Sequence, residues 1–288
     1  MKQYKIVLGI ELGSDFIRIA EVEHREEEYF LSKVAERKIG TIQSDELVKT
    51  LSLLMNEESI MGRVASVAID TRMIARDTID IDANLGSDDI ASFLRAEIDF
   101  HNKFSAKSYI PAYEFTKSNV DPYREVFYAA MEKELLFTLR DSCTRCGLDL
   151  RFVDLDHSCS ELAINKLNKN AGNYILITVK EGQVEASFCA DGERMIYKYI
   201  AYSGEPFYFI TKAAEELEFK SKIDPARIFL TGSAADSFLV DLLRKNVDER
   251  YELLAPSGSM KLSSVASEYE ELKEHPHLYS HAIGAALK

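Results

Sequence analysis

Hydrophobic residues near the start of the chain alternate with polar ones, as they do in paired strands of a sheet. Apolar segments cover residues 6–12 and 16–22, and Gly13, Ser14 and Asp15 between them have the composition of a turn. A third apolar segment follows at residues 29–35. This pattern predicts three consecutive antiparallel strands, and the backbone N–H groups of the first turn could converge on an anion.

The same pattern returns in the second half of the chain. Apolar segments cover residues 174–179, 183–189 and 194–200, and Asp191 and Gly192 form a tight-turn signal before the last of them. Two similar three-stranded units in one chain predict an internally duplicated fold.

Helical periodicity and further strands lie between and after these two units. Residues 44–56 carry Leu47, Leu51 and Leu54 on one helical face, with Ser44 as the candidate N-cap. Further elements are predicted as strands at residues 64–69, 74–81, 126–130 and 227–232, and as helices from Ser87 and at residues 132–146, 237–246 and 281–287. The polar residues 257–277 are predicted as a loop with one exposed helical turn.

This order of elements resembles the actin-like ATPase superfamily, in which two phosphate loops, an adenosine loop and two connecting helices surround ATP between two lobes. The glycine that ends the segment RIFLTG at 227–232 and the small-residue helix HAIGAAL at 281–287 fall where that resemblance requires them. Residues 87–104 and 123–164 look like the corresponding region of the PilM family of type IV pilus assembly proteins, which are related to FtsA.

The resemblance implies an α/β fold of the actin-like ATPase type, a duplicated ribonuclease H-like architecture with two lobes. The first lobe would span residues 1–171 and contain an inserted α+β subdomain at about 63–150. The second lobe would span residues 172–288, with the final helix at 280–288 packing back toward the first.

The resemblance also implies where a nucleotide would bind. ATP with magnesium would contact residues of the three loops, namely Gly13, Ser14, Asp15, Gly182, Gly232 and Ser233. Glu11 stands where family members usually carry an aspartate, and it is a candidate catalytic carboxylate.

Three departures argue against a working nucleotide site. Thr178 and Lys180 occupy the second phosphate loop where the family has Asp-x-Gly, so the carboxylate for hydrated magnesium and the glycine for close backbone approach are both missing. The adenosine loop has Gly232 and Ser233 in place of two glycines. The short stretch between the second three-stranded unit and residue 227 leaves out the small subdomain that covers the adenine.

Two local clusters have competing interpretations. Asp154 and Asp156 precede a connecting helix, where one of them could act as a general base toward the γ-phosphate or could cap the helix, and the cap is favoured. Cys143, Cys146, His157 and Cys159 have zinc-like spacing, but the first two fall on one helical face before Gly147, which favours core thiols and no metal site.

Composition narrows the partners and the compartment. The 288 residues carry a net charge of −13 with 46% hydrophobic residues, which argues against nucleic acid and against direct membrane insertion. Without an apolar span or a signal-peptide pattern in the sequence, we expect a cytoplasmic protein that a partner could recruit to the inner face of the membrane.

Three functions are compatible with these observations. The first is a PilM-like scaffold for assembly of a type IV pilus or related secretion machine, which binds a cytoplasmic peptide of a membrane protein in a groove of the first lobe. The second is an ATP-binding switch of the same fold. The third is a sugar-kinase-like phosphotransferase. The sequence favours the scaffold. The changed second phosphate loop and the missing adenine subdomain would impair catalysis, whereas the surface of the first lobe is unaffected by these changes.

Overall fold

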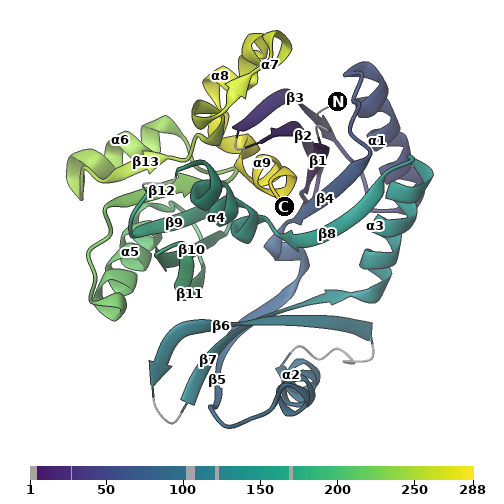
Figure 1. Cartoon of the computed structure of the whole chain (residues 1–288). Helices are drawn as coiled ribbons and strands as arrows, with labels where there is room; N and C mark the ends of the chain where they lie inside the picture. The colour runs from purple at the N-terminus through teal and green to yellow at the C-terminus, as the bar shows by residue number, and fades with distance from the viewer. Residues whose placement is uncertain (1–4, 27, 102–107, 121–122, 169–170) are drawn as a thin grey trace.

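A six-stranded sheet forms the first half of the structure (Figure 1). The computed structural model describes residues 5–26, 28–101, 108–120, 123–168 and 171–288. The strand order is β14-β3-β2-β1-β4-β8, with β1 antiparallel to β2 and parallel to β4. Its strands are β1 (Lys5–Leu12), β2 (Phe16–Arg25), β3 (Glu28–Lys38), β4 (Val64–Ile69), β8 (Asp149–Leu155) and β14 (Lys261–Leu262). The three strands predicted first are confirmed.

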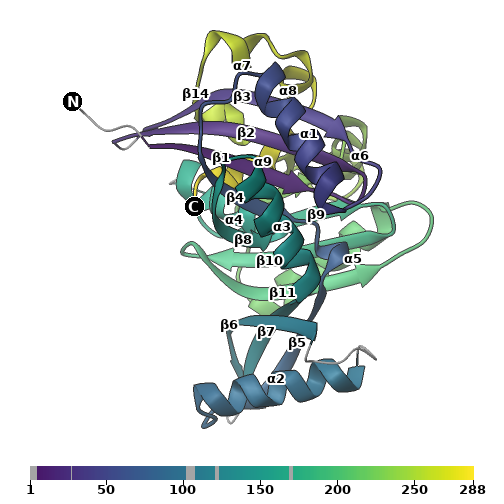
Figure 2. The same ribbon diagram turned by 90° about the vertical axis from the view of Figure 1, so that its right-hand side faces the viewer.

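Two helices cover one face of this sheet, α1 (Ser44–Glu57) and α3 (Lys133–Arg145) (Figure 2). Leu47, Leu51 and Leu54 of α1 are buried in the core beneath it, as their spacing predicts. The N-cap of α1 is Gln43 and not Ser44, whose hydroxyl instead hydrogen-bonds Asp141 of α3. The cap predicted at Ser44 is therefore wrong, and the Ser44 side chain links α1 to α3 instead.

The second sheet repeats the strand pattern of the first. Its order is β11-β10-β9-β12-β13, with β9 antiparallel to β10 and parallel to β12. Asp191 and Gly192 both have positive φ in the turn that joins β10 to β11. The elements are β9 (Tyr174–Lys180), β10 (Gln183–Ala190), β11 (Glu193–Ala201), α5 (Phe207–Ser221), β12 (Arg227–Thr231), α6 (Ser237–Asn246) and β13 (Tyr251–Leu253).

A smaller unit is inserted between β4 and α3. It contains a three-stranded sheet of order β5-β7-β6, and α2 packs on one face of that sheet (Figures 1 and 2). A short 3-10 helix, η1 (Thr71–Met73), leads into it from β4. The elements are β5 (Ala75–Asp82), α2 (Ser87–His101), β6 (Tyr109–Val120) and β7 (Tyr123–Glu132), of which β6 has no counterpart among the strands predicted from sequence.

Two helices pack against each other between the large sheets, α4 (Asp156–Leu167) and α9 (Ser280–Ala286) (Figure 1). Glycines permit the close contact. A Cβ atom on Gly284 would lie 1.9 Å from the carbonyl oxygen of Cys159 in α4, and one on Gly9 of β1 would lie 1.9 Å from that of Ala282 in α9. The small residues seen in the sequence of the last helix therefore set the spacing of the junction.

The segment before α9 differs from the predicted loop. It forms η3 (Pro256–Ser259), β14, α7 (Ser264–Glu268), α8 (Glu270–Glu274) and η4 (Pro276–Tyr279). β14 pairs with β3, and Ala266 and Leu272 are buried beside Leu31. Long-range packing against the first sheet orders a segment whose composition alone indicates a loop.

Candidate functional site

A buried lysine lies at the junction of the two large sheets. Lys180 ends β9, and its Nζ atom lies 2.6 Å from Asp156 Oδ2, 3.0 Å from Asp70 Oδ1 and 3.3 Å from Glu185 Oε1. The ammonium also donates a hydrogen bond of 2.7 Å to Thr71 Oγ1. The three carboxylates come from the end of β4, the start of α4 and the middle of β10. We call these five residues the Lys180 cluster.

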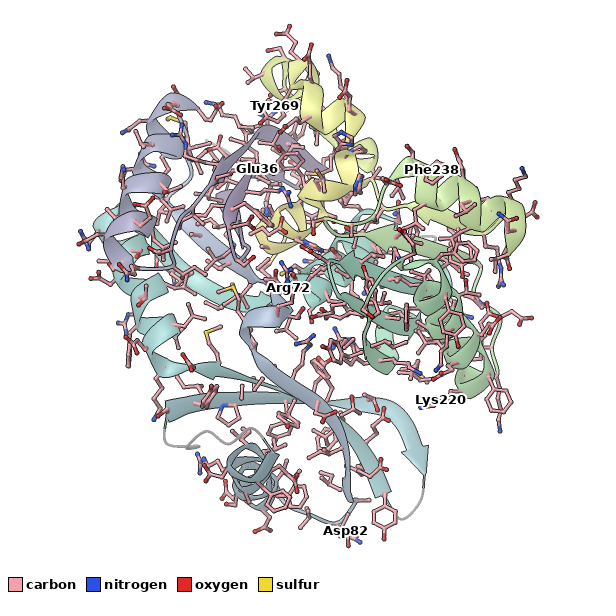
Figure 3. The ribbon with its side chains drawn as sticks, turned by 180° about the vertical axis from the view of Figure 1, so that it is seen from behind. Glu36, Arg72, Asp82, Lys220, Phe238 and Tyr269 are labelled. Atoms are coloured by element: carbon pink, nitrogen blue, oxygen red, sulfur yellow. The ribbon has the colours of Figure 1, made fainter. Side chains whose placement is uncertain are left out.

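Arginines extend the cluster to the inserted unit. Arg76 of β5 lies 3.6 Å from Glu185 and donates from Nε to the Tyr197 hydroxyl at 3.2 Å, while Tyr197 donates to Glu185 at 2.8 Å. Arg72 holds Asp70 through Nη2 and Nε at 2.6 and 2.9 Å. Figure 3 shows Arg72 at the centre of the molecule, where the three sheets approach one another.

Electrostatics keep the lysine charged inside the protein. Burial by itself lowers the pKa of Lys180, but Asp156, Glu185 and Asp70 outweigh burial and raise that pKa. Burial opposes ionisation of Glu185 and Asp70 too, yet Lys180 lowers the pKa of both. Burial raises the pKa of Asp156, and Lys180 offsets this only in part. Together with Arg72 and Arg76, which pair with Asp70 and Glu185, the cluster is thus an internal network of ion pairs in which three cations face three carboxylates.

A second buried chain of charges lies beside the first strand. Glu11 Oε1 is 2.8 Å from His281 Nδ1 of α9 and 3.5 Å from Arg18 Nη1, and Arg18 Nε is 2.5 Å from Glu36. Burial lowers the pKa of His281, but the carboxylate of Glu11 overrides it and raises that pKa. Glu11, the candidate catalytic carboxylate, is engaged in joining β1 to the last helix.

In the first predicted phosphate loop, Phe16 contacts Gly13 through both its carbonyl and its ring. The Gly13 N–H donates to the Phe16 carbonyl at 3.0 Å, and the Phe16 ring covers Gly13 so closely that a Cβ there would lie 2.3 Å from it. Ser14 and Asp15 are exposed, and the Ser14 hydroxyl donates to Asp15 at 3.3 Å. One of the backbone donors that a phosphate would need in this turn, the Gly13 N–H, is therefore already engaged, and the Phe16 ring occupies the space beside it.

The other predicted loop residues serve the second sheet. Gly182 has a positive φ in the turn after Lys180, and its carbonyl accepts from the Tyr202 N–H at 3.0 Å. Gly232 has a φ of 98°, and a Cβ there would lie 2.4 Å from the Val179 carbonyl oxygen. Ser233 follows it on the surface. The structure brings Gly182 and Gly232 next to opposite sides of the end of β9.

These residues do not fit ATP with magnesium bound as the resemblance implies. A hydrated magnesium ion needs free carboxylate oxygens, and phosphates need free N–H groups or cations. Here the carboxylates of Asp70, Asp156 and Glu185 already surround the ammonium of Lys180. The cation that these three carboxylates require is therefore the ammonium of Lys180.

The two aspartates before α4 have separate partners. Asp154 lies at the end of β8, where it accepts from the Leu155 N–H at 2.8 Å and pairs with Lys288. Asp156 is in the Lys180 cluster. The N-cap position itself is Leu155, so neither aspartate occupies it, but Asp156 Oδ1 accepts from the His157 N–H in the first turn of α4 at 2.7 Å and so satisfies one of the free donors there.

A third polar chain surrounds His157. Its two ring nitrogens each lie 2.8 Å from a hydroxyl, that of Thr178 and that of Ser187, and burial lowers its pKa to about 4. Cys143 and Cys146 pack on the α1–α3 core, which confirms them as core thiols. Among the residues that the structure describes, no group of three His, Cys, Asp or Glu side chains is placed to hold a metal ion.

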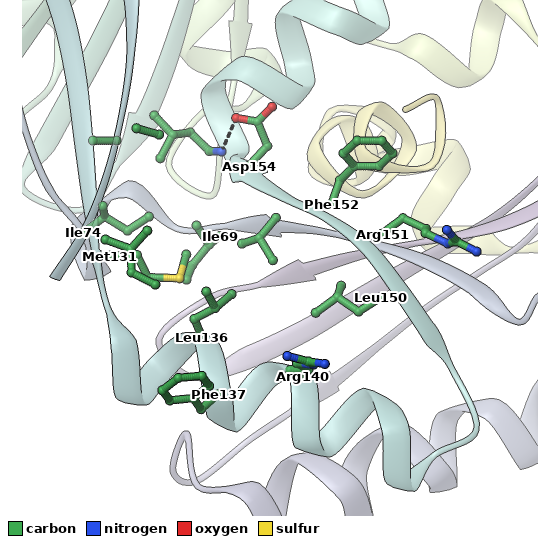
Figure 4. Close-up of a pocket in the computed structure, with 15 residues that line it drawn as sticks. Ile69, Ile74, Met131, Leu136, Phe137, Arg140, Leu150, Arg151, Phe152 and Asp154 are labelled. Carbon is green, nitrogen blue, oxygen red and sulfur yellow. Dashed lines mark hydrogen bonds between the residues drawn. The ribbon is translucent and has the colours of Figure 1, made fainter. Parts of the chain in front are cut away.

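An apolar groove lies at the free edge of β8. It has a volume of about 420 Å³, and it lies between β8, α3 and the face of the inserted sheet opposite α2 (Figure 4). Three of the hydrophobic side chains that line it are exposed: Phe137 at 60%, Phe152 at 49% and Ile110 at 39%. Across the described part of the chain, β8 pairs with β4 alone, so its outer edge is open. Further lining residues are Ile69, Ile74, Ala129, Met131, Leu136 and Leu155.

Sequence reasoning missed most of the Lys180 cluster. It identified Lys180 as a departure and Asp156 as a candidate, but not Asp70, Thr71 or Glu185. A signal was present, since Lys180, Gln183 and Glu185 are polar residues within otherwise apolar strands that are buried on both faces. Only the fold shows that Lys180 pairs with Asp70 and Asp156 and that Gln183 and Glu185 bond to Thr71.

Comparison with solved structures identifies the class of fold. A chain of the PilM-PilN type IV pilus biogenesis complex matches with a TM-score of 0.75 at 15% identity, covering 98% of this chain and 97% of that one. A Bacteroides thetaiotaomicron protein with an actin-like ATPase fold and unknown function matches with a TM-score of 0.54 at 14% identity, over 88% and 91% of the two chains. The fold is therefore that of the actin-like ATPases, as the sequence predicts.

A particular likeness stands out within that class. The PilM-PilN match covers nearly all of both chains, and it confirms the resemblance inferred from the sequence at the level of structure. The cytoplasmic domain of EpsL, an inner membrane component of the Vibrio cholerae type II secretion system, matches with a TM-score of 0.51 at 10% identity, over 87% and 90% of the two chains. No family model and no curated protein matches the sequence.

Proposed function

We propose that this chain is a PilM-like actin-fold scaffold that binds a short cytoplasmic peptide of a membrane protein during assembly of a type IV pilus or related secretion machine. The likeness to a chain of the PilM-PilN complex supports this proposal. None of the helices in the described residues is long and apolar enough to span a membrane. In this proposal the protein is cytoplasmic, and its membrane-protein partner recruits it to the membrane.

The apolar groove at the edge of β8 is the observation that carries the proposal. Exposed large hydrophobic side chains that gather in a hollow are typical of a binding surface. An extended peptide could pair with the open edge of β8 and insert alternate apolar side chains between α3 and the inserted sheet. The seven residues of β8 would accommodate about six residues of such a peptide.

The chemistry of the lining defines the peptide. Ile110, Met131, Leu136 and Phe137 form apolar walls, and Arg140 lies on the same side of the groove as Phe137. An apolar segment in β conformation fits these walls, and Arg140, Arg151 and Asp154 are the charged residues of the lining that could pair with a charge on the peptide. The partner motif is therefore an extended segment rich in aliphatic residues with few charged positions.

Nucleotide binding is weak or lost in this proposal. The switch and phosphotransferase alternatives both require metal and phosphate where the Lys180 ammonium is already paired with three carboxylates. The phosphotransferase also requires Asp154 or Asp156 as a free base, and both are engaged in ion pairs. The scaffold function requires neither.

A peptide-binding assay tests the proposal. Seven-residue peptides from a display library are selected on the purified chain, and one is labelled for fluorescence anisotropy. Phe137→Glu should then weaken binding by about 10-fold to 100-fold, because burial of a phenylalanine side chain contributes roughly 1.5–3 kcal/mol. Since Phe137 is 60% exposed, the variant should remain folded.

Phe219→Glu is the matched control. Phe219 is 84% exposed on α5 of the second lobe, outside the groove, so its replacement should leave affinity unchanged. If no selected peptide binds, or if both variants bind as wild type, the groove is not the binding site and the proposal is wrong.

A further inference from the structure

The Lys180 cluster and the peptide groove share the same strand ends. Ile69, at the end of β4, lines the groove, and the next residue, Asp70, holds Lys180. Leu155, at the end of β8, also lines the groove, and the next residue, Asp156, makes the shortest of the carboxylate contacts to Lys180. Each strand therefore places one residue in the groove and its neighbour in the cluster.

The inserted unit makes the same connection. Ile74 lines the groove just before β5, and Arg76 two residues later lies 3.6 Å from Glu185. Arg76 also donates to the carbonyl of Thr71, whose hydroxyl accepts from Lys180 at 2.7 Å. Three residues that line the groove, Ile69, Ile74 and Leu155, thus lie within two positions of a residue that contacts the charged cluster or belongs to it.

We infer that Lys180 is a built-in replacement for a bound cation, and that its charge holds the groove in its peptide-binding shape. This inference rests on the proposed peptide site. Without the ammonium, Asp70 keeps Arg72 and Glu185 keeps Arg76, but the carboxylate of Asp156 would have no ion-pair partner among the described residues and would repel the two neighbouring carboxylates. The strand ends would separate, and Ile69, Ile74 and Leu155 would move with them.

The geometry explains why the groove would need no bound nucleotide to keep its shape. Closure of two lobes around a ligand is a common switch, in which the ligand supplies the contacts that hold the closed state. In this chain Lys180 belongs to the second sheet, and Asp70 and Asp156 follow strands of the first. The contact that joins the lobes is therefore permanent, and the groove is set for the peptide at all times.

Three variants test the inference with the labelled peptide of the preceding section. Lys180→Met keeps the length of the side chain and removes its charge, and we expect affinity to fall by about tenfold or more. Lys180→Arg restores a cation, and we expect affinity within about threefold of wild type. Leu243→Ala removes a fully buried side chain of α6 far from the groove, and it should lower stability without changing affinity.

The outcomes separate the two proposals. Unchanged affinity in Lys180→Met overturns the inference, and so does an equal loss in Lys180→Met and Lys180→Arg, since the charge would then not be the cause. A loss in Leu243→Ala as large as in Lys180→Met also overturns it, because general destabilisation would explain both. If Lys180→Met does not fold, Lys180→Gln, which removes the same positive charge but keeps a hydrogen-bond donor for the carboxylates, carries the same expectation. If the wild-type protein binds no peptide, the proposed function itself is wrong.

Discussion

Replacing Lys180 by methionine should cost the protein a large part of its stability. The substitution removes an ammonium that contacts three buried carboxylates and keeps most of the side-chain volume. Asp70 retains Arg72 and Glu185 retains Arg76, whereas Asp156 retains no ion-pair partner among the described residues. The variant therefore leaves one charge without an ion-pair partner at the junction of the two large sheets.

The size of the loss follows from that uncompensated charge. Removing one partner of a buried ion pair costs about 3–5 kcal/mol, because the remaining charge is neither solvated nor paired. Folded proteins have unfolding free energies of about 5–15 kcal/mol, so the variant should remain folded in buffer. Protonation of Asp156 would remove the unpaired charge and reduce the cost.

Burial already raises the pKa of Asp156, and loss of Lys180 removes the interaction that opposes this rise. A carboxyl whose pKa is higher in the folded than in the unfolded state favours folding as pH falls, and that stability is lost as pH rises through the folded pKa. The cost of Lys180→Met should therefore be largest at pH 8 and smaller at pH 5. The dependence approaches about 1.4 kcal/mol per pH unit where one extra proton is bound.

Urea denaturation at pH 5, 6, 7 and 8 measures this cost for wild type and variant. Lys198→Met is a matched control, since Lys198 is a partly exposed lysine of β11 that pairs only with Glu216 among the described residues. We expect a loss below about 1 kcal/mol there at every pH. A loss that small for Lys180→Met at pH 8, or a loss independent of pH, would refute the reasoning.

Two further predictions concern the junction of the lobes. Gly284→Ala should lower the unfolding free energy by about 3 kcal/mol because its Cβ would meet the Cys159 backbone at 1.9 Å, whereas Gly258→Ala, in open space, should be neutral in the same urea titration. His281→Gln should cost about 1–3 kcal/mol at pH 6, because Glu11 loses a charged partner. Glu11 raises the pKa of His281, so the wild-type advantage should be full below pH 6.5 and should diminish as pH rises through the folded pKa. An advantage that grows with pH would contradict this assignment.

The sequence predicted much of the fold because local pattern and global fold agree there. The apolar segments of β1, β2, β9 and β10 and the helical stripe of α1 are local signals, and each element lies where it was expected. The alternation of buried and exposed positions expected in the strands is absent, because helices and neighbouring elements bury both faces of these four strands. β6 and the segment from η3 to α8 were not predicted as strand and helices. The segment from η3 to α8 depends on packing against β3, which is distant in sequence, and composition does not contain that information. β6 pairs with the next strand, β7, but its sequence includes Pro111 and several polar residues, which are not typical of a strand.

The candidate site was less predictable for a related reason. The loss of Asp-x-Gly at Thr178 and Lys180 is visible in the sequence, but its consequence depends on three carboxylates from other elements. Asp70 is 110 positions from Lys180 in the chain, yet its carboxylate lies 3.0 Å from the ammonium. A departure from a motif indicates only what is missing, and the structure shows what has taken its place.

Calorimetric titration with ATP and magnesium tests the central claim most directly. The account predicts no saturable heat up to about millimolar nucleotide, because Lys180 supplies the cation and Phe16 covers the first turn. A non-hydrolysable analogue should give the same result. Saturable binding at about micromolar concentration would show that the lobes open and that the Lys180 cluster exchanges its lysine for a nucleotide, and it would contradict the account.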